Sequence, residues 1–327
     1  MNNTTCIFIL GMNGSGTHML ADCLNNHPLI YIHSQEILTI PYYYYNVSKY
    51  GDLQNENNFN KLLKDFCNNP GFLSCNKWLP LEIPINFDDL EEKNLSQVVH
   101  VTFSFFASKV KKAIWGEHSP KYALFIPQLI DLFPKSKIIH LIRDGRDNAQ
   151  SLKRRFGHNI YRTIFQWKTL IKKARSDGLS AGAERYFEIR YEDLTNSPEY
   201  CMKNICSFLG VPFDERVLNS KMPMYEAKVL SRQKGTIVPN YGKWRKSFTM
   251  PQIKKLEGIA GETLVNLGYE TMFKTGNKDI GRIRLFFLKW LDKIHVLVLL
   301  VFKRKYSIYR VGNAIMTSLK QNKHYKY

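Results

Sequence analysis

The chain has 327 residues, of which 44% are hydrophobic, and a formal net charge of +19 at pH 7. This length suffices for a large α/β domain with its own core, alone or with an appended segment. The positive charge favours anionic partners such as nucleotides, sulfated or phosphorylated acceptors or a membrane surface, without choosing among them. The six cysteines lack C-x-x-C spacing, which argues against metal binding.

The first predicted element is a buried strand that starts near Cys6 and leads through a glycine-rich turn into a helix beginning near Ser15. Glycines in the turn let backbone N–H groups approach an anion, and the helix start adds the positive end of its dipole. The pattern G-x-x-x-x-G is that of a nucleotide-binding P-loop, but Thr17 and His18 stand where an ATPase has Lys and Ser or Thr. We therefore predict a phosphate cradle that works without a metal; the alternative is a loop that only turns the chain. The candidate ligand-binding residues are Asn13, Gly14, Ser15, Gly16, Thr17 and His18.

This early strand leaves no room for a signal peptide before it, so we expect a cytoplasmic protein with reduced, buried cysteines. Helical spacing continues from residue 17 to 26, and residues 29–32 are strand-like. Residues 46–112 have weak periodicity, and we expect irregular helices that cap the site. The four tyrosines at 42–45 either line an acceptor groove or pack within this cap.

Further strands are predicted near residues 114–120, 137–144 and 185–191, and helices near 123–133, 148–155, 198–210 and 251–267. Strands that alternate with helices favour a parallel sheet covered on both faces. The second of these strands is a continuous apolar run and ends at Arg143 and Asp144. It would deliver Arg143 to the carboxyl edge of the sheet, where open α/β folds bind ligands. The alternative for Arg143 is a salt bridge to Asp144 or Asp147.

The last 49 residues form a different kind of segment, with eleven Lys or Arg against two Asp. Residues 285–302 are apolar and aromatic, but Lys289, Asp292, Lys293 and His295 interrupt them, so a spanning helix is disfavoured. We expect either an interfacial helix attracted to anionic lipid or a helix docked on the domain with a disordered basic end.

Four segments in order resemble sulfotransferases that use 3′-phosphoadenosine 5′-phosphosulfate (PAPS). The glycine-rich loop at 11–20 is similar to the family's 5′-phosphosulfate loop, and Arg143-Asp144-Gly145-Arg146-Asp147 with Ser151 is similar to its 3′-phosphate site. Residues 191–194 look like its Y-E-D-L segment and residues 242–244 like its G-K-W loop. The resemblance covers roughly residues 6–270 and implies a P-loop NTPase-like three-layer α/β fold with a central parallel sheet.

Within this family, residues 35–41 resemble a segment of tyrosylprotein sulfotransferases and their bacterial relatives. The match implies that Glu36 accepts the proton of the acceptor hydroxyl and that His118, in place of the family's lysine, is an electrophilic donor. It implies nucleotide contacts from Arg143, Ser151, Tyr191, Gly242, Lys243 and Arg245. The alternatives for these side chains are core packing or solvated charge. One departure is Gly14, where the family usually carries Arg or Lys.

We therefore predict a sulfotransferase domain over residues 1–275, with 46–112 as acceptor region, and a basic amphipathic tail over 276–327. The expected reaction moves a sulfuryl group from PAPS to a hydroxyl on an unidentified acceptor, such as a glycan, a lipid headgroup or a peptide tyrosine. Two alternatives are a non-catalytic relative that binds a nucleotide or polyanion and a P-loop kinase. No motif for nucleic-acid binding is present.

Overall fold

The computed structural model describes residues 5–33, 39–69, 83–220 and 237–302. The chain divides into two compact units. The first comprises residues 1–143 and 169–241, and the second comprises residues 144–168 and 242–327. Helix α8 (Ile160–Ala181) contributes to both units.

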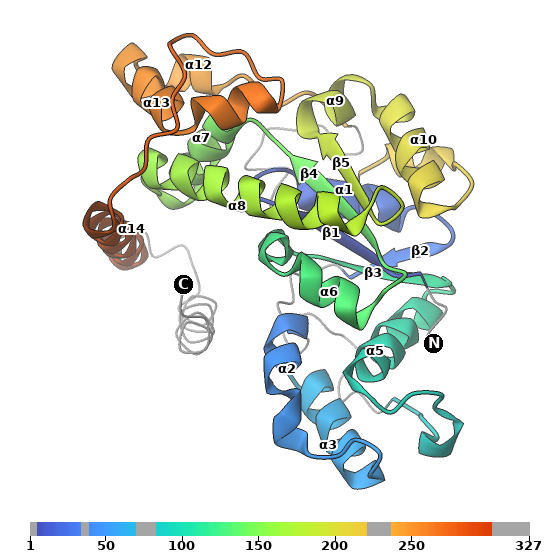
Figure 1. Cartoon of the computed structure of the whole chain (residues 1–327). Helices are drawn as coiled ribbons and strands as arrows, with labels where there is room; N and C mark the ends of the chain where they lie inside the picture. The colour runs from blue at the N-terminus through green and yellow to red at the C-terminus, as the bar shows by residue number, and fades with distance from the viewer. Residues whose placement is uncertain (1–4, 34–38, 70–82, 221–236, 303–327) are drawn as a thin grey trace. The chain divides into compact units, whose positions relative to one another are not determined.

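A five-stranded parallel sheet organises the first unit (Figure 1). Its order is β2-β3-β1-β4-β5, and every pair of neighbouring strands is parallel. This confirms the predicted parallel sheet and places the glycine-rich loop after its central strand. The strands are β1 (Ile7–Gly11), β2 (Ile30–Ile32), β3 (Ile114–His118), β4 (Lys137–Ile142) and β5 (Tyr186–Arg190).

Helices cover both faces of this sheet, which confirms the predicted three-layer architecture. Successive side chains of a strand point to opposite faces, and in β1 Phe8 belongs to one buried cluster whereas Ile7 and Ile9 belong to the other. The Phe8 cluster includes residues from α3 (Glu56–Cys67), α5 (Leu95–Lys109) and α6 (Ile126–Leu132). The opposite cluster includes residues from α1 (Thr17–Asn25), α9 (Tyr191–Asn196) and α10 (Pro198–Leu209).

The helices expected over residues 46–112 are present in the described parts, but the expectation that they are irregular was wrong for the two long ones. Helices α3 and α5 are regular, and the side chains of Asn55 and Asn94 cap their first turns. These caps satisfy backbone N–H groups that a helix start leaves without partners. The periodicity of α5 is weak because its buried face is wide and includes polar residues such as Gln97 and Thr102. The shorter elements here are α2 (Ile40–Asn46), η1 (Val47–Tyr50) and η2 (Phe87–Asp89).

Two predicted helix boundaries also differ from the observed ones. The helix expected at 123–133 is split into η3 (Pro120–Leu124) and α6, because Pro127 lacks an N–H and is tolerated only in a first helical turn. The helix expected from 148 begins earlier, as α7 (Gly145–Phe156), because the Asp144 side chain accepts a hydrogen bond from the Arg146 N–H and caps it.

The second unit is helical. It contains α7, the start of α8, α12 (Trp244–Ser247), α13 (Met250–Asn266) and α14 (Arg282–Phe302). Trp167 of α8 is fully buried, and a Cβ on Gly145 would lie 2.5 Å from its ring. In the part of the chain that is described, no helix combines the length and apolarity that crossing a membrane requires. The remaining short element, η4 (Glu215–Leu218), belongs to the first unit.

Candidate functional site

The turn between β1 and α1 exposes the start of a helix at the carboxyl edge of the sheet. The Ser15 N–H donates to the Met12 carbonyl oxygen at 2.9 Å and closes the turn. Gly14 and Gly16 have φ values of 86° and 103°, a region that glycine adopts without strain. Helix α1 begins at Thr17 with no side-chain cap, so its first N–H groups have no acceptor within the helix. Such an end attracts anions.

The packing of this turn explains why Gly16 is required there. A Cβ at Gly16 would lie 2.8 Å from the ring of Tyr191, closer than side chains approach. Tyr191 is buried at the start of α9, directly after β5. Ser15 is also buried, and no hydrogen-bond partner of its hydroxyl appears among the described residues. A buried hydroxyl of this kind calls for a polar ligand, because leaving it unpaired costs free energy.

Arg143 follows β4 and lies against the same turn. Its Nη1 donates to the Gly14 carbonyl oxygen at 2.8 Å, its Nη2 donates to the Asn240 carbonyl oxygen, and its guanidinium lies 4.5 Å above the Tyr191 ring. Arg143 is 7% exposed. The first unit thus holds a fixed cation next to a helix start, which suits a phosphate ligand.

A cluster of histidines lies at the carboxyl end of the neighbouring strand β3. The fully buried His118 has its Nδ1 3.0 Å from the His33 carbonyl oxygen and its Nε2 3.1 Å from Nδ1 of His18. His18 belongs to the first turn of α1. Nδ1 of His33 is 2.9 Å from the Tyr31 hydroxyl. Burial, and secondarily the nearby His118, lowers the pKa of His33 to about 3, so His33 is neutral at pH 7.

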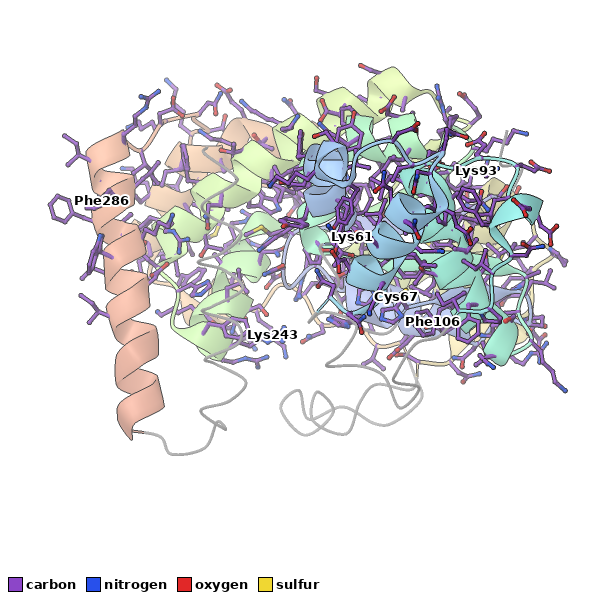
Figure 2. The ribbon with its side chains drawn as sticks, turned by 90° about the horizontal axis from the view of Figure 1, so that it is seen from below. Lys61, Cys67, Lys93, Phe106, Lys243 and Phe286 are labelled. Carbon is purple, nitrogen blue, oxygen red and sulfur yellow. The ribbon has the colours of Figure 1, made fainter. Side chains whose placement is uncertain are left out.

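Four of the other predicted residues, Ser151, Gly242, Lys243 and Arg245, lie in the second unit, where Asp147 holds the loop that carries the last three. The Asp147 carboxylate accepts from the Gly242 N–H at 2.6 Å and from the Trp244 N–H at 3.2 Å, and so it fixes the loop that carries Lys243. Lys243 is exposed (Figure 2). The Arg245 guanidinium, also exposed, lies 4.5 Å from the Trp244 ring centroid. Ser151 is buried on α7.

The sequence pattern did not reveal a buried ion-pair network in this segment. Arg146 pairs with Asp144 at 2.7 Å and with Glu257 of α13 at 2.6 Å, and its guanidinium lies 3.8 Å from the Trp244 ring centroid. Arg146 and Glu257 are 111 residues apart, so no local signal links them. Asp144 therefore caps α7 and pairs with Arg146, and Asp147 accepts hydrogen bonds from the loop at 242–244. His33, which follows the strand predicted at 29–32, was also not predicted as a site residue. The signal available in the sequence was its position directly after an apolar run of strand length.

Glu36, the predicted proton acceptor, lies outside the described residues. Asn13 is exposed at the tip of the turn. The first unit therefore brings together the cradle residues 14–18, Arg143, Tyr191 and His118, from four neighbouring strand ends. The N–H and O–H groups of these residues can donate hydrogen bonds to the oxygens of an anionic ligand.

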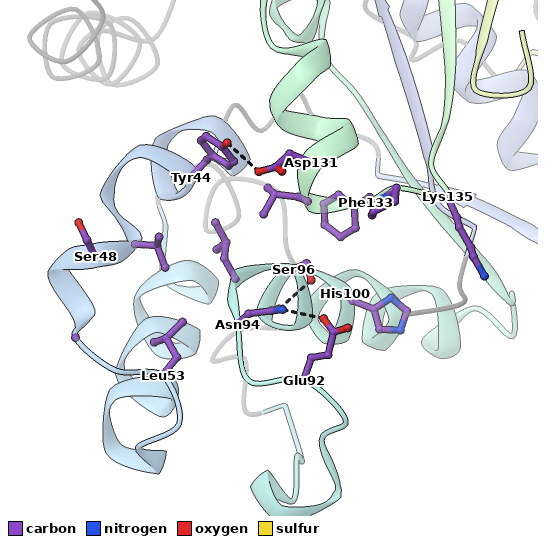
Figure 3. Close-up of a pocket in the computed structure, with 15 residues that line it drawn as sticks. Tyr44, Ser48, Leu53, Glu92, Asn94, Ser96, His100, Asp131, Phe133 and Lys135 are labelled. Carbon is purple, nitrogen blue, oxygen red and sulfur yellow. Dashed lines mark hydrogen bonds between the residues drawn. The ribbon is translucent and has the colours of Figure 1, made fainter. Parts of the chain in front are cut away.

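A cavity of about 820 Å³ in the first unit lies elsewhere (Figure 3). The Tyr44 hydroxyl donates to Asp131 at 2.9 Å on one wall, and Asn94, His100 and Lys135 lie on others. Lys135 precedes β4, whereas the cradle follows β1, and in a parallel sheet these positions belong to opposite edges. Of the predicted tyrosines, Tyr44 lines this cavity and Tyr43 is buried against Phe66.

Comparisons with known proteins agree on one family. The model described as "Sulfotransferase family" matches residues 6–215. "Protein-tyrosine sulfotransferase 2" of Gallus gallus is 35% identical over 95 residues, which are 27% of this chain and 26% of that protein. The chain thus covers about a quarter, or less, of the length of the curated relatives that head the comparison.

Two solved structures share the fold. The "Sulfotransferase Domain from the Synechococcus PCC 7002 Olefin Synthase" is 22% identical, with a TM-score of 0.54, and the match covers 83% of this chain and 98% of that one. The "Sulfotransferase Domain from the Curacin Biosynthetic Pathway" is also 22% identical, with a TM-score of 0.53 and coverage of 83% and 100%.

Proposed function

The chain belongs to the sulfotransferase family, and from this premise we propose that it transfers a sulfuryl group from PAPS to a hydroxyl of an acceptor. The observation that carries the proposal is the bond from Arg143 to the Gly14 carbonyl oxygen, which holds a buried cation beside the uncapped start of α1. PAPS is a polyanion, and its bound sulfuryl group is the electrophile of the reaction.

The donors present in the cradle fit such a ligand. The buried Ser15 hydroxyl and the first N–H groups of α1 supply hydrogen bonds that an anionic oxygen accepts. Gly16 packs so close to Tyr191 that no Cβ fits there, which keeps the turn narrow beside the start of α1. We assign residues 13–18 to the 5′-phosphosulfate on this basis.

The remaining roles follow the family resemblance. Arg143, with Ser151, would bind the 3′-phosphate, because a guanidinium meets phosphate oxygens in pairs. Lys243 and Arg245, on the loop that begins at Gly242, would add cations to the same phosphate, and Tyr191 would contact the nucleoside.

Two residues would act on the reacting atoms. Glu36 would accept the proton of the acceptor hydroxyl, a role that typically contributes roughly 10²- to 10⁴-fold in rate. His118 would donate a hydrogen bond to the oxygen that leaves with the phosphate, where negative charge grows. The chain has Gly14 where the family usually carries a cation. The His18–His118 pair supplies polar groups next to the cradle instead.

We propose a hydroxyl-bearing acceptor such as a glycan, a glycolipid or a peptide tyrosine. The partial identity to "Protein-tyrosine sulfotransferase 2" supports including tyrosine peptides among the acceptors tested. We also propose a cytoplasmic location, supported by five free, buried cysteines among the described residues. Burial raises the pKa of Cys23 to about 12 and that of Cys67 to about 11, so these thiols are unreactive.

The experiment is transfer of ³⁵S-label from PAPS by the full chain to fractionated cell extract and to a tyrosine peptide. We expect label in one acceptor class, and binding of 3′,5′-diphosphoadenosine by calorimetry. Nucleotide binding without transfer to any fraction would instead support a non-catalytic relative. Transfer of ³²P from γ-labelled ATP, with no sulfuryl transfer, would establish the kinase alternative and overturn the proposal.

A further inference from the structure

Helix α14 presents an apolar stripe to solvent. Six large side chains among its described residues are between 49% and 76% exposed: Ile283, Phe286, Phe287, Trp290, Leu291 and Ile294. Their spacing is i, i+3, i+4, i+7, i+8 and i+11, and at about 100° per residue they fall on one face of the helix. Phe286 projects outward from the α14 ribbon (Figure 2). Scattered exposed apolar residues are normal, but a contiguous stripe marks an interaction site.

The opposite face of α14 is held within the second unit. Asp292 is 6% exposed, and its carboxylate accepts from the Asn159 N–H at 2.8 Å and from the Arg162 guanidinium. Asp292 lies about half a helical turn round from the centre of the apolar stripe. These bonds to the start of α8 fix the rotation of α14 about its axis, so the stripe faces away from the body of its own unit.

Cations border the stripe on both sides. Arg282 and Lys289 lie along one border and Arg284 along the other, and all three are exposed. The acidic residue of the described part of α14, Asp292, is buried in its ion pair with Arg162 and leaves the exposed surface cationic. The sequence continues with Lys303-Arg304-Lys305, and the last 49 residues carry eleven Lys or Arg against two Asp.

We propose that the stripe of α14 lies in the interface of an anionic lipid membrane, with the helix axis parallel to its plane. An apolar face bordered by cations, with aromatic residues among its members, is the pattern of an interfacial helix. The charge pattern disfavours a second copy of this chain as the occupant, because two such faces would bring their cationic borders together. This inference concerns a surface of the second unit and holds whether or not the proposed transfer reaction is correct.

The first test is sedimentation of the full chain with vesicles of phosphatidylcholine alone or mixed with phosphatidylglycerol. We expect binding to the anionic vesicles, at least about tenfold weaker binding to the neutral ones, and weakening by salt. The double variant Phe286→Glu/Trp290→Glu should lose binding. The matched control, Leu179→Glu/Tyr200→Glu, changes residues that are 63% and 69% exposed on α8 and α10 and should bind as the parent does.

Tryptophan emission gives a second readout. Of the five tryptophans, Trp115, Trp167 and Trp244 are buried, Trp290 is 52% exposed and Trp78 lies outside the described residues. We expect a blue shift on adding anionic vesicles, and its dependence on Trp290 assigns it. The shift should diminish in Trp290→Phe, which keeps an apolar side chain and should still bind.

Three results would overturn the proposal. One is binding that survives Phe286→Glu/Trp290→Glu, which would assign it to the basic segment beyond residue 302. Another is absence of vesicle binding by a folded parent chain. The third is a dimer in sedimentation velocity that this double variant dissociates while vesicle binding stays unchanged, which would assign the stripe to a second copy.

Discussion

Nε2 of His118 lies 3.1 Å from Nδ1 of His18, although the two residues are 100 positions apart. A carbonyl oxygen only accepts hydrogen bonds, so the 3.0 Å contact with the His33 carbonyl places a proton on Nδ1 of His118. Nε2 of a neutral His118 therefore accepts from His18, whereas Nε2 of a charged His118 donates. The geometry thus fixes Nε2 as the nitrogen of His118 that faces the cradle.

We predict from this pair that activity depends on a hydrogen bond donated by Nε2 of His118 at the cradle. His118→Gln should lower kcat by about 100-fold and change the affinity for 3′,5′-diphosphoadenosine little. His118→Lys should keep more activity than His118→Gln, because a lysine ammonium also donates hydrogen bonds to a growing negative charge. The measurement is kcat and the affinity for 3′,5′-diphosphoadenosine of the three proteins. A large loss of nucleotide affinity with unchanged kcat would contradict the assigned role.

Variants of Arg143 and of Glu36 should affect two different quantities, the affinity for the nucleotide and the rate of sulfuryl transfer. Arg143→Ala should weaken 3′,5′-diphosphoadenosine binding by at least tenfold, because it removes a buried guanidinium whose paired N–H groups donate to phosphate oxygens. Glu36→Gln should abolish transfer and leave this affinity nearly unchanged. Calorimetry and label transfer on both variants make the comparison, with Arg216→Ala and Glu262→Gln, two exposed positions, as controls. Equal affinity of Arg143→Ala and the parent would rule out the 3′-phosphate role.

Two glycines should respond to alanine in opposite directions. Gly16→Ala places a Cβ 2.8 Å from the Tyr191 ring at a φ of 103°, and it should lower the free energy of unfolding by more than about 1 kcal/mol. Gly258, in α13, has open space at its Cβ position, so Gly258→Ala should raise the same free energy by about 0.5–1 kcal/mol. Urea denaturation measures both. A neutral Gly16→Ala would show that the turn can widen.

The buried network around Arg146 should be essential to the second unit. Arg146→Ala leaves the carboxylates of Asp144 and Glu257 buried without their cation, and it should cost roughly 3–5 kcal/mol of the free energy of unfolding. The exposed pair of Arg216 with Asp214 provides the control, and Arg216→Ala should leave the melting temperature unchanged. If the two variants melt alike, the network has no such role.

Acid should destabilise the fold through buried histidines. Burial lowers the pKa of both His33 and His140 to about 3, whereas an unfolded histidine has a pKa of about 6.5. Between these values the unfolded chain binds more protons, so each contributes stability that is complete above pH 6.5 and is lost as pH falls toward 3. We expect a loss of roughly 2 kcal/mol per histidine between pH 7 and pH 5.

The test replaces His140, whose Nδ1 lies 2.6 Å from the Tyr186 hydroxyl. The free energy of unfolding of His140→Phe should fall less between pH 7 and pH 5 than that of the parent, whatever its value at pH 7. An identical pH dependence in both proteins would show that His140 does not carry this effect.

The sequence by itself determined which segments form the strands, the glycine-rich turn after β1 and the position of Arg143 at the carboxyl edge of the sheet. These features follow from local patterns: apolar runs of strand length, glycines where φ is positive and the parallel direction of alternating strands and helices. The α/β fold, the parallel sheet and the family were therefore predicted correctly from residues close to one another in the chain.

Only the tertiary structure decided how charged and polar side chains are paired. Arg143 donates to a carbonyl 129 residues away, Arg146 pairs with a carboxylate 111 residues away, and His118 meets His18 rather than solvent. The rotation of α14, and hence the exposure of its apolar stripe, likewise depends on the bond from Asn159 to Asp292, 133 residues apart. Local periodicity predicts which residues share a face, but partners distant in sequence meet only after the chain has folded, so their identity is fixed by packing.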